Sequence, residues 1–167
     1  IVLEGKEAGG HLGTDTSVRD LIADVSAAVK VPVIAAGGIL HGQDIVDLIK
    51  MGAAGVQMGS RFAASEESNA APALKEYYLK SRPEDIVVIH SPVGLPGRAV
   101  HTPFSARVLE GPVPPKQCDA CLKACQHNFC IIRALTRAQQ GDVETGLVFT
   151  GEYMPQIDRV LSVHEIF

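Results

Sequence analysis

Two short apolar runs that end at small residues constrain the fold of this chain more than any other feature. Residues 31–36 contain no polar alternation and stop at Gly37-Gly38, and residues 55–58 stop at Gly59-Ser60 in the same way. Apolar runs of this length without alternation are typical of strands buried on both faces, as in parallel sheets. The chain is therefore predicted to contain parallel strands with small residues at their carboxyl ends.

The segments around these runs have the spacing of helices. Ser17, with Asp20 three residues later, indicates a helix start. Apolar residues follow at helical spacing as Val18, Leu21, Ile22, Val25 and Val29. A second short helix is predicted around residues 45–49, ending at Gly52, and residues 1–3 have the composition of a strand end. This alternation predicts parallel βα units. A complete eight-fold βα barrel takes about 250 residues, so a chain of 167 residues is expected to be a fragment of one.

Composition and charge limit the classes of partner. The chain has 15 Lys and Arg against 19 Asp and Glu, a formal net charge of −4, and no basic stripe. Small molecules are therefore expected as partners, and nucleic acids or anionic membranes are not. No apolar run reaches the ~20 residues of a spanning helix, and the first residues lack the regions of a signal peptide. A cytoplasmic enzyme or binding module is the expected class.

Three segments rich in small residues are predicted to meet at one edge of the sheet, because parallel strands place their carboxyl ends together. They are Gly9-Gly10 with His11 after it, Gly37-Gly38, and Gly59-Ser60. Glycines expose backbone N–H groups without side-chain cover, which suits a phosphate group at the second and third segments. The imidazole of His11 offers proton chemistry near neutral pH. Without these neighbours, His11 would be interpreted as a hydrogen-bonded loop residue.

All the cysteines lie close together, at Cys118, Cys121, Cys125 and Cys130. Such clustering suggests zinc or an iron–sulfur cluster, although the spacing matches neither a paired zinc-ribbon pattern nor the ferredoxin pattern. The same thiols, with Leu122, Phe129 and Ile132, also fit one face of a helix, where they would act as small hydrophobes. Both interpretations stay open.

Further elements are predicted from spacing and turn residues. A helix capped by Ser68-Asn69 is expected to run through Tyr78, and residues 86–89 form a short strand. Residues 91–98 are expected to be irregular because they contain two prolines and two glycines. A helix over residues 131–138 ends at Gly141, residues 146–150 form a strand or turn, and a last helix covers residues 157–166.

The glycine-containing segments also carry a family resemblance. Residues 7–13 (EAGGHLG), 32–39 (PVIAAGGI) and 55–62 (GVQMGSRF) resemble, in order and spacing, the nitronate monooxygenases, formerly called 2-nitropropane dioxygenases. They equally resemble the close relatives of that family, the flavin-type enoyl-acyl-carrier-protein reductases. The resemblance extends through residues 67–70 and 91–98 and is weaker beyond Pro112.

This resemblance implies an α/β fold that is the C-terminal part of a (β/α)8 TIM barrel. Residues 1–111 would form its last three βα units, and residues 112–167 a cysteine-containing helical extension packed on the barrel. It implies FMN as cofactor and His11 as the catalytic base. The residues implied to bind FMN are Gly9, Gly10, Gly37, Gly38, Gln57, Met58, Gly59 and Ser60. The sequence departs from the family pattern at Glu4, where many relatives carry glutamine, and at Ser60, where threonine is common.

Three functions follow from the resemblance and from the length of the chain. The first is oxidation of alkyl nitronates by O2, and the second is reduction of an enoyl thioester with NAD(P)H. The third is of another class: a truncated, non-catalytic barrel or a metal-binding segment. A half barrel leaves two sheet edges open, so the chain by itself is expected to be poorly soluble or a homo-oligomer.

Overall fold

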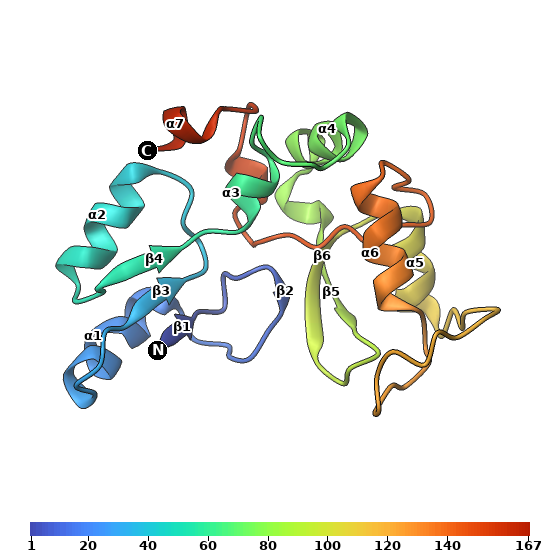
Figure 1. Cartoon of the computed structure of the whole chain (residues 1–167), viewed down its shortest axis with the longest axis horizontal. Coiled ribbons are helices and arrows are strands. Elements are labelled where there is room, and N and C mark those ends of the chain that lie inside the picture. The colour runs from blue at the N-terminus through green and yellow to red at the C-terminus, as the bar shows by residue number, and fades with distance from the viewer.

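A parallel sheet forms the first half of the chain in the computed structural model, which describes all 167 residues (Figure 1). Its strands are β1 (Val2–Glu4), β3 (Ile34–Ala36) and β4 (Gly55–Gln57), in the order β1-β3-β4. The register pairs Glu4 with Ala36 and Ala36 with Gln57, so the three strands end at the same level. The predicted parallel strands are thus present, and their carboxyl ends meet.

Two helices cover this sheet, as their apolar spacing predicts. They are α1 (Val18–Ala28), capped by the Ser17 hydroxyl, which accepts a hydrogen bond from the Arg19 N–H, and α2 (Gly42–Lys50). Their inward side chains form a core with residues of the strands and of the loops beside them: Val18, Ile22, Val33, Ala35, Ile39, Leu48 and Ala53. Fully burying a side chain such as Ile22, which is 0% exposed, contributes roughly 1.5–3 kcal/mol.

A second, antiparallel sheet forms the other half. It contains β2 (Gly10–His11), β5 (Ile86–His90) and β6 (Pro96–Val100), in the order β2-β6-β5. The predicted irregularity of residues 91–98 is therefore wrong for residues 96–98. Pro96 is the first residue of β6, a position where a strand tolerates the missing N–H. The turn itself is confined to residues 91–95, where the Ser91 N–H donates to the Leu95 carbonyl at 3.0 Å.

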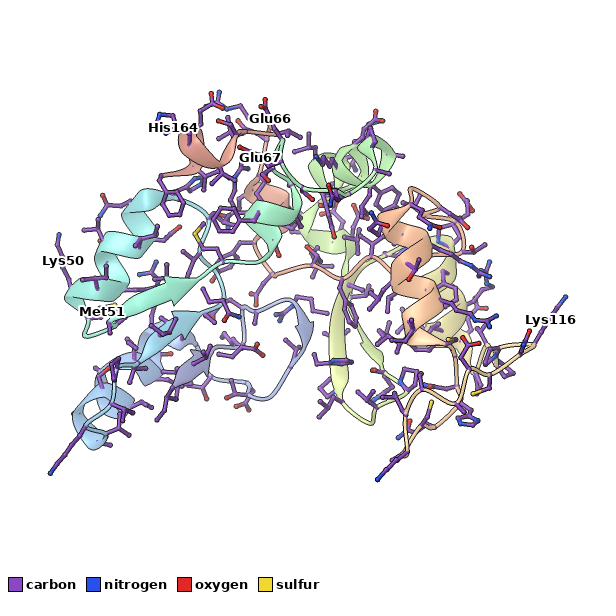
Figure 2. All side chains as sticks on the ribbon, viewed as in Figure 1. Lys50, Met51, Glu66, Glu67, Lys116 and His164 are labelled. Atoms are coloured by element: carbon purple, nitrogen blue, oxygen red, sulfur yellow. The ribbon has the colours of Figure 1, made fainter.

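The remaining helices are short. They are α3 (Ser60–Ala63), α4 (Pro72–Lys80), α5 (Pro103–Glu110), α6 (Ile131–Gln139) and α7 (Val163–Ile166), with single turns of 3-10 helix at Pro83–Asp85 and Met154–Gln156. The prediction for residues 131–138 is confirmed, whereas the predicted helix over 157–166 is wrong for residues 157–162. Ser162 and Glu165 form a capping box that starts the helix at Val163. The Glu67 carboxylate also accepts from the Val163 N–H at 3.0 Å, and Figure 2 shows Glu67 close to α7.

The C-terminal segment joins the two halves. In Figure 1, the chain after α6 runs across the centre of the molecule toward α3. Two of the three core clusters combine residues from both sides of position 111. One joins Leu40, Leu74 and Val100 to Val148 and Met154, and another joins Ile89 and Phe104 to Phe129 and Leu147. The boundary at residue 111 stays a prediction of the sequence, but the core is continuous across it. None of the helices has the length and apolar character needed to traverse a bilayer.

Candidate active site

A cleft of about 420 Å³ lies at the carboxyl ends of the parallel strands. Its walls come from the ends of β1, β3 and β4 on one side and from residues 149–153 of the C-terminal segment on the other. The lining includes the eight residues that the family resemblance implies as cofactor ligands, namely Gly9, Gly10, Gly37, Gly38, Gln57, Met58, Gly59 and Ser60. The volume is within the range of roughly 300–1,000 Å³ that is common for ligand sites.

Gly37 and Gly38 end β3 in a conformation that other residues rarely adopt, with φ of 104° and 68°. A Cβ atom at Gly38 would lie 2.9 Å from the ring of Tyr153 and 3.0 Å from the Cβ of Glu7. The turn after β3 is therefore kept small both by its backbone and by the side chains packed against it.

Several polar groups at the strand ends are free to meet a ligand. The backbone N–H groups of Gly37, Gly38 and Gly59 donate to no backbone oxygen. The Ser60 hydroxyl oxygen accepts a hydrogen bond from the Gly151 N–H at 2.7 Å, which leaves its own proton available for donation. Gly37 and Gly38 are half-buried, and backbone N–H groups at such positions usually have partners. These donors thus form a cradle for an oxygen-rich anionic group.

Arg98 and Glu7 hold the loop that leads to His11, and spacing in the sequence does not indicate either role. The Arg98 guanidinium donates to the carbonyls of Lys6 and Ala8, the latter at 2.7 Å, and forms an ion pair with Glu152 at 3.1 Å. Glu7 is 4% exposed and accepts from the Val18 N–H at 3.2 Å, at the start of α1. The only feature of the sequence that pointed to a role for Arg98 was its position inside the motif of residues 91–98.

His11 lies beside the cleft rather than in its wall. It belongs to β2, whose Gly10 and His11 pair with Arg98 and Gly97 of β6. The expectation that His11 sits at the carboxyl end of a parallel strand is therefore wrong. His11 follows the loop after β1 and belongs to strand β2 of the antiparallel sheet. Its Nε2 atom is 2.7 Å from the Oγ atom of Ser91, which is completely buried. Its ring packs edge-on against Phe149, with 5.4 Å between centroids.

Phe149 connects His11 to the cleft, which it lines. Its carbonyl accepts a hydrogen bond from the Tyr78 hydroxyl at 2.9 Å, and its backbone bridges to Ala99 of β6. Burial raises the pKa of Tyr78 to about 12, so this hydroxyl remains a donor at neutral pH. Sequence reasoning assigned residues 146–150 only to a strand or turn and did not place them at the site.

Two ionisable groups in the cleft have shifted pKa values. Burial raises the pKa of the Glu4 carboxyl above its ordinary value, and the nearby charge of His11 partly opposes this change. Burial also raises the pKa of the Tyr153 hydroxyl, and the negative charges of Glu7 and Glu152 raise it further. Tyr153 is consequently a neutral hydrogen-bonding group at physiological pH.

The cysteines lie far from this cleft, in the segment between α5 and α6. The predicted helix face is wrong, because the only helix near them begins at Ile131. Cys118 and Cys121 are exposed, so they do not act as buried hydrophobes. The four sulfur-bearing residues do line one small cavity of about 20 Å³. No group of three or more His, Cys, Asp or Glu side chains is arranged to hold a metal ion as the chain stands.

A cleft at the carboxyl ends of parallel βα strands, lined by glycines with free N–H groups, is typical of ligand-binding proteins of the α/β class. The sequence model described as "Nitronate monooxygenase" matches residues 1–167. The chain belongs to the nitronate monooxygenase family.

Relatives with curated names and solved structures agree with this assignment. A probable nitronate monooxygenase of Staphylococcus aureus (strain JH9) is 35% identical over 125 residues, which cover 68% of this chain and 35% of that protein. FabK from Thermotoga maritima superposes with a TM-score of 0.80 and 35% identity, covering 99% of this chain and 50% of that one. Nitroalkane oxidase from Streptomyces ansochromogenes superposes with a TM-score of 0.73 and 25% identity, covering 99% of this chain and 48% of that one. The chain thus spans about a third of the length of the curated relative and about half of each solved structure.

Proposed function

We propose that the protein binds FMN in the cleft and oxidises alkyl nitronates with O2, with His11 as the base. Membership of the nitronate monooxygenase family supports the reaction class. The observation that carries the proposal is that all eight residues implied to bind FMN line one cleft. Bound FMN would supply the redox chemistry, accepting electrons from the substrate and passing them to O2.

The chain's own donors suit a flavin phosphate at the strand ends. The N–H groups of Gly37, Gly38 and Gly59 are unpaired with backbone acceptors, and the Ser60 hydroxyl can donate. The small residues allow the backbone to approach the phosphate without side-chain interference. Gly9 and Gly10 would contact the remainder of the cofactor on the side of the cleft nearest His11.

His11 would take the acidic α-proton when a neutral nitroalkane enters the site and so form the nitronate there, because an imidazole can act as a base near neutral pH. Ser91 would act as a positioning residue. If the Ser91 hydroxyl oxygen accepts from the Nε2–H group, the imidazole is held in the tautomer whose Nδ1 atom has the free lone pair. The Arg98 contacts to the Lys6 and Ala8 carbonyls would keep the loop before His11 in place.

Reduction of an enoyl thioester with NAD(P)H is the second candidate. It is favoured by the higher structural similarity to FabK, with a TM-score of 0.80, than to the nitroalkane oxidase, with 0.73. The same cleft and FMN would serve both reactions. A third possibility, a non-catalytic half barrel, would bind no flavin.

The test combines FMN titration with two kinds of assay. One measures O2 uptake with propionate 3-nitronate and with its protonated form, 3-nitropropionate, and the other measures crotonyl thioester reduction with NADH. We expect FMN binding and nitronate-dependent O2 uptake. His11→Asn should lower the turnover of 3-nitropropionate, whose α-proton must be removed, by about 100-fold or more while FMN still binds. His164→Asn, which changes an exposed histidine of α7, is the matched control and should leave the turnover and the FMN affinity unchanged. Activity with the thioester alone would establish the second candidate, and a chain that cannot be reconstituted with FMN would establish the third.

A further inference from the structure

We propose that Cys118, Cys121, Cys125 and Cys130 together bind a thiophilic metal centre, either one zinc ion or an iron–sulfur cluster, through four thiolates. This centre would cross-link the segment between α5 and α6, residues 111–130, and fix it against the hairpin of β5 and β6. It is separate from the FMN cleft and does not depend on the function proposed for that cleft.

The four cysteines converge on one place. All of them line the same small cavity of about 20 Å³, although no helix or strand orders the residues that separate them. The nearest carboxylate is already engaged, because Asp119 accepts two hydrogen bonds from the Arg133 guanidinium at 2.6 and 2.9 Å. The donors left facing the cavity are thiols and the imidazole of His127, and soft thiolates select zinc and iron–sulfur clusters.

Backbone hydrogen bonds anchor the ends of the segment, whereas the bidentate pair of Asp119 with Arg133 is the ion pair that holds its middle. At the ends, the Val113 N–H donates to the Asn128 carbonyl at 2.6 Å, and the Gln126 N–H donates to the Pro92 carbonyl at 2.9 Å. Phe129, which is 1% exposed, packs edge-on against Phe104. Residues 114–125 make no backbone–backbone hydrogen bond at all. Figure 2 shows Lys116 at the outer tip of this segment, pointing away from the molecule.

The backbone of the same segment adopts costly conformations. Ala120 and His127, with φ of 48° and 57°, are the chain's only non-glycine residues with positive φ. Each such residue costs roughly 1–2 kcal/mol, and no backbone–backbone hydrogen bond of residues 114–125 offsets this cost at Ala120. The Ala120 N–H donates to the Cys118 sulfur at 3.4 Å, the type of contact that orients a ligating thiolate.

Each of two cysteine pairs taken alone has a zinc-binding spacing, although only three residues separate the pairs, fewer than in a zinc ribbon. Two residues separate Cys118 from Cys121 and four separate Cys125 from Cys130, and both lie within the two-to-four-residue spacing of zinc-binding cysteine pairs. The sulfurs are not yet in coordination geometry, so metal binding would draw residues 114–125 inward. Coupling of metal binding to the ordering of a short segment is common. Through Gln126 and Pro92, the ordered segment would brace the turn that carries Ser91.

Metal analysis of the full chain, purified anaerobically with reductant after growth with zinc and iron, tests the proposal. We expect about one zinc ion per chain, or about four iron and four sulfide with absorption near 400 nm. The thiols should react with a thiol reagent only after a chelator or denaturant is added. Cys121→Ser and Cys125→Ser should each lower the metal content at least ten-fold. Lys123→Ala is the matched control, because it changes an exposed residue of the same segment that does not line the cavity. This variant should retain the full metal content.

Limited proteolysis gives a second readout that needs neither flavin nor activity. Cleavage after Lys116 or Lys123 should become at least ten-fold faster when the metal is removed. The proposal is overturned if the chain holds less than about 0.1 metal per chain after both growth and anaerobic reconstitution, with four freely reactive thiols. It is equally overturned if mass spectrometry without reductant finds disulfides between these cysteines, or if the Cys→Ser variants retain the metal.

Discussion

At the residue scale, the chemistry proposed for His11 depends on a partner that is 80 residues away in the sequence. Ser91 contributes its Oγ atom at 2.7 Å from Nε2, and its own position is fixed by the turn between β5 and β6. Because Ser91 is completely buried and does not line the cleft, it can affect the histidine without contacting a ligand.

Ser91→Ala removes the hydrogen bond that would fix the imidazole tautomer. A hydrogen bond of this kind is worth about 1 kcal/mol, so the turnover of 3-nitropropionate should fall roughly five-fold with unchanged FMN affinity. Steady-state kinetics and FMN titration measure the two effects. Ser81→Ala, which removes another buried hydroxyl that donates to the Tyr78 carbonyl, should not change the turnover. A parallel loss in both variants would show that Ser91 acts only through stability.

Glu4→Gln should change how stability depends on pH. The pKa of Glu4 is raised above its ordinary value of 4.5 by burial, although the charge of His11 partly lowers it. The folded chain therefore binds more protons than the unfolded chain between these two pKa values, and its unfolding free energy falls as the pH rises through that window. At neutral pH, Glu4→Gln should thus be more stable than the parent chain, and this difference should shrink below about pH 4.

Urea unfolding of both chains at several pH values measures this difference. Glu66→Gln changes an exposed carboxyl outside the cleft and serves as the control. An unchanged difference across the whole pH range would contradict the assignment.

At the scale of elements, the site depends on a close contact between the turn after β3 and the C-terminal segment. The Tyr153 ring lies over Gly38, and the Glu152 N–H donates to the Glu7 carbonyl at 3.0 Å. The Gly151 N–H adds its bond to Ser60 at the start of α3. The C-terminal segment thereby contacts the loop after β1, the turn after β3 and the start of α3, and it holds these distant parts of the sequence together along the cleft.

Gly38→Ala should break this contact. The new Cβ would lie 2.9 Å from the Tyr153 ring, and an alanine at φ of 68° adds about 1–2 kcal/mol of backbone cost. We expect a loss of roughly 2–4 kcal/mol in unfolding free energy together with weaker FMN binding, measured by urea unfolding and FMN titration. Gly13→Ala, where the added Cβ meets nothing within 4 Å, should cost much less. Equal stability of the two variants would disprove the packing argument.

At the scale of the whole molecule, the parallel sheet has two unpaired edges, because β1 and β4 each pair only with β3. Ile1 and Val2 are 58% and 55% exposed at one of these edges. An exposed apolar edge strand is a template for pairing with another chain.

The chain by itself should therefore associate with increasing concentration, as light scattering coupled to gel filtration would measure. Val2→Lys should reduce this association, because a lysine on an edge strand opposes pairing. Val46→Lys changes an equally apolar residue that is 44% exposed but lies on helix α2 rather than on an edge strand, and it should have little effect. A monodisperse monomer at high concentration would refute the edge argument.

The eight residues that the family resemblance implies as FMN ligands all line the cleft. The sequence by itself determined the parallel βα order and the glycine turns after β3 and β4. These features follow from local periodicity and turn chemistry, which are encoded within about a dozen neighbouring residues. Only the tertiary structure decided that β2 pairs with β6, that His11 meets Ser91 and that residues 149–153 close the cleft. Such contacts join segments with no shared local pattern, since long-range packing and hydrogen-bond satisfaction select them after the elements have formed.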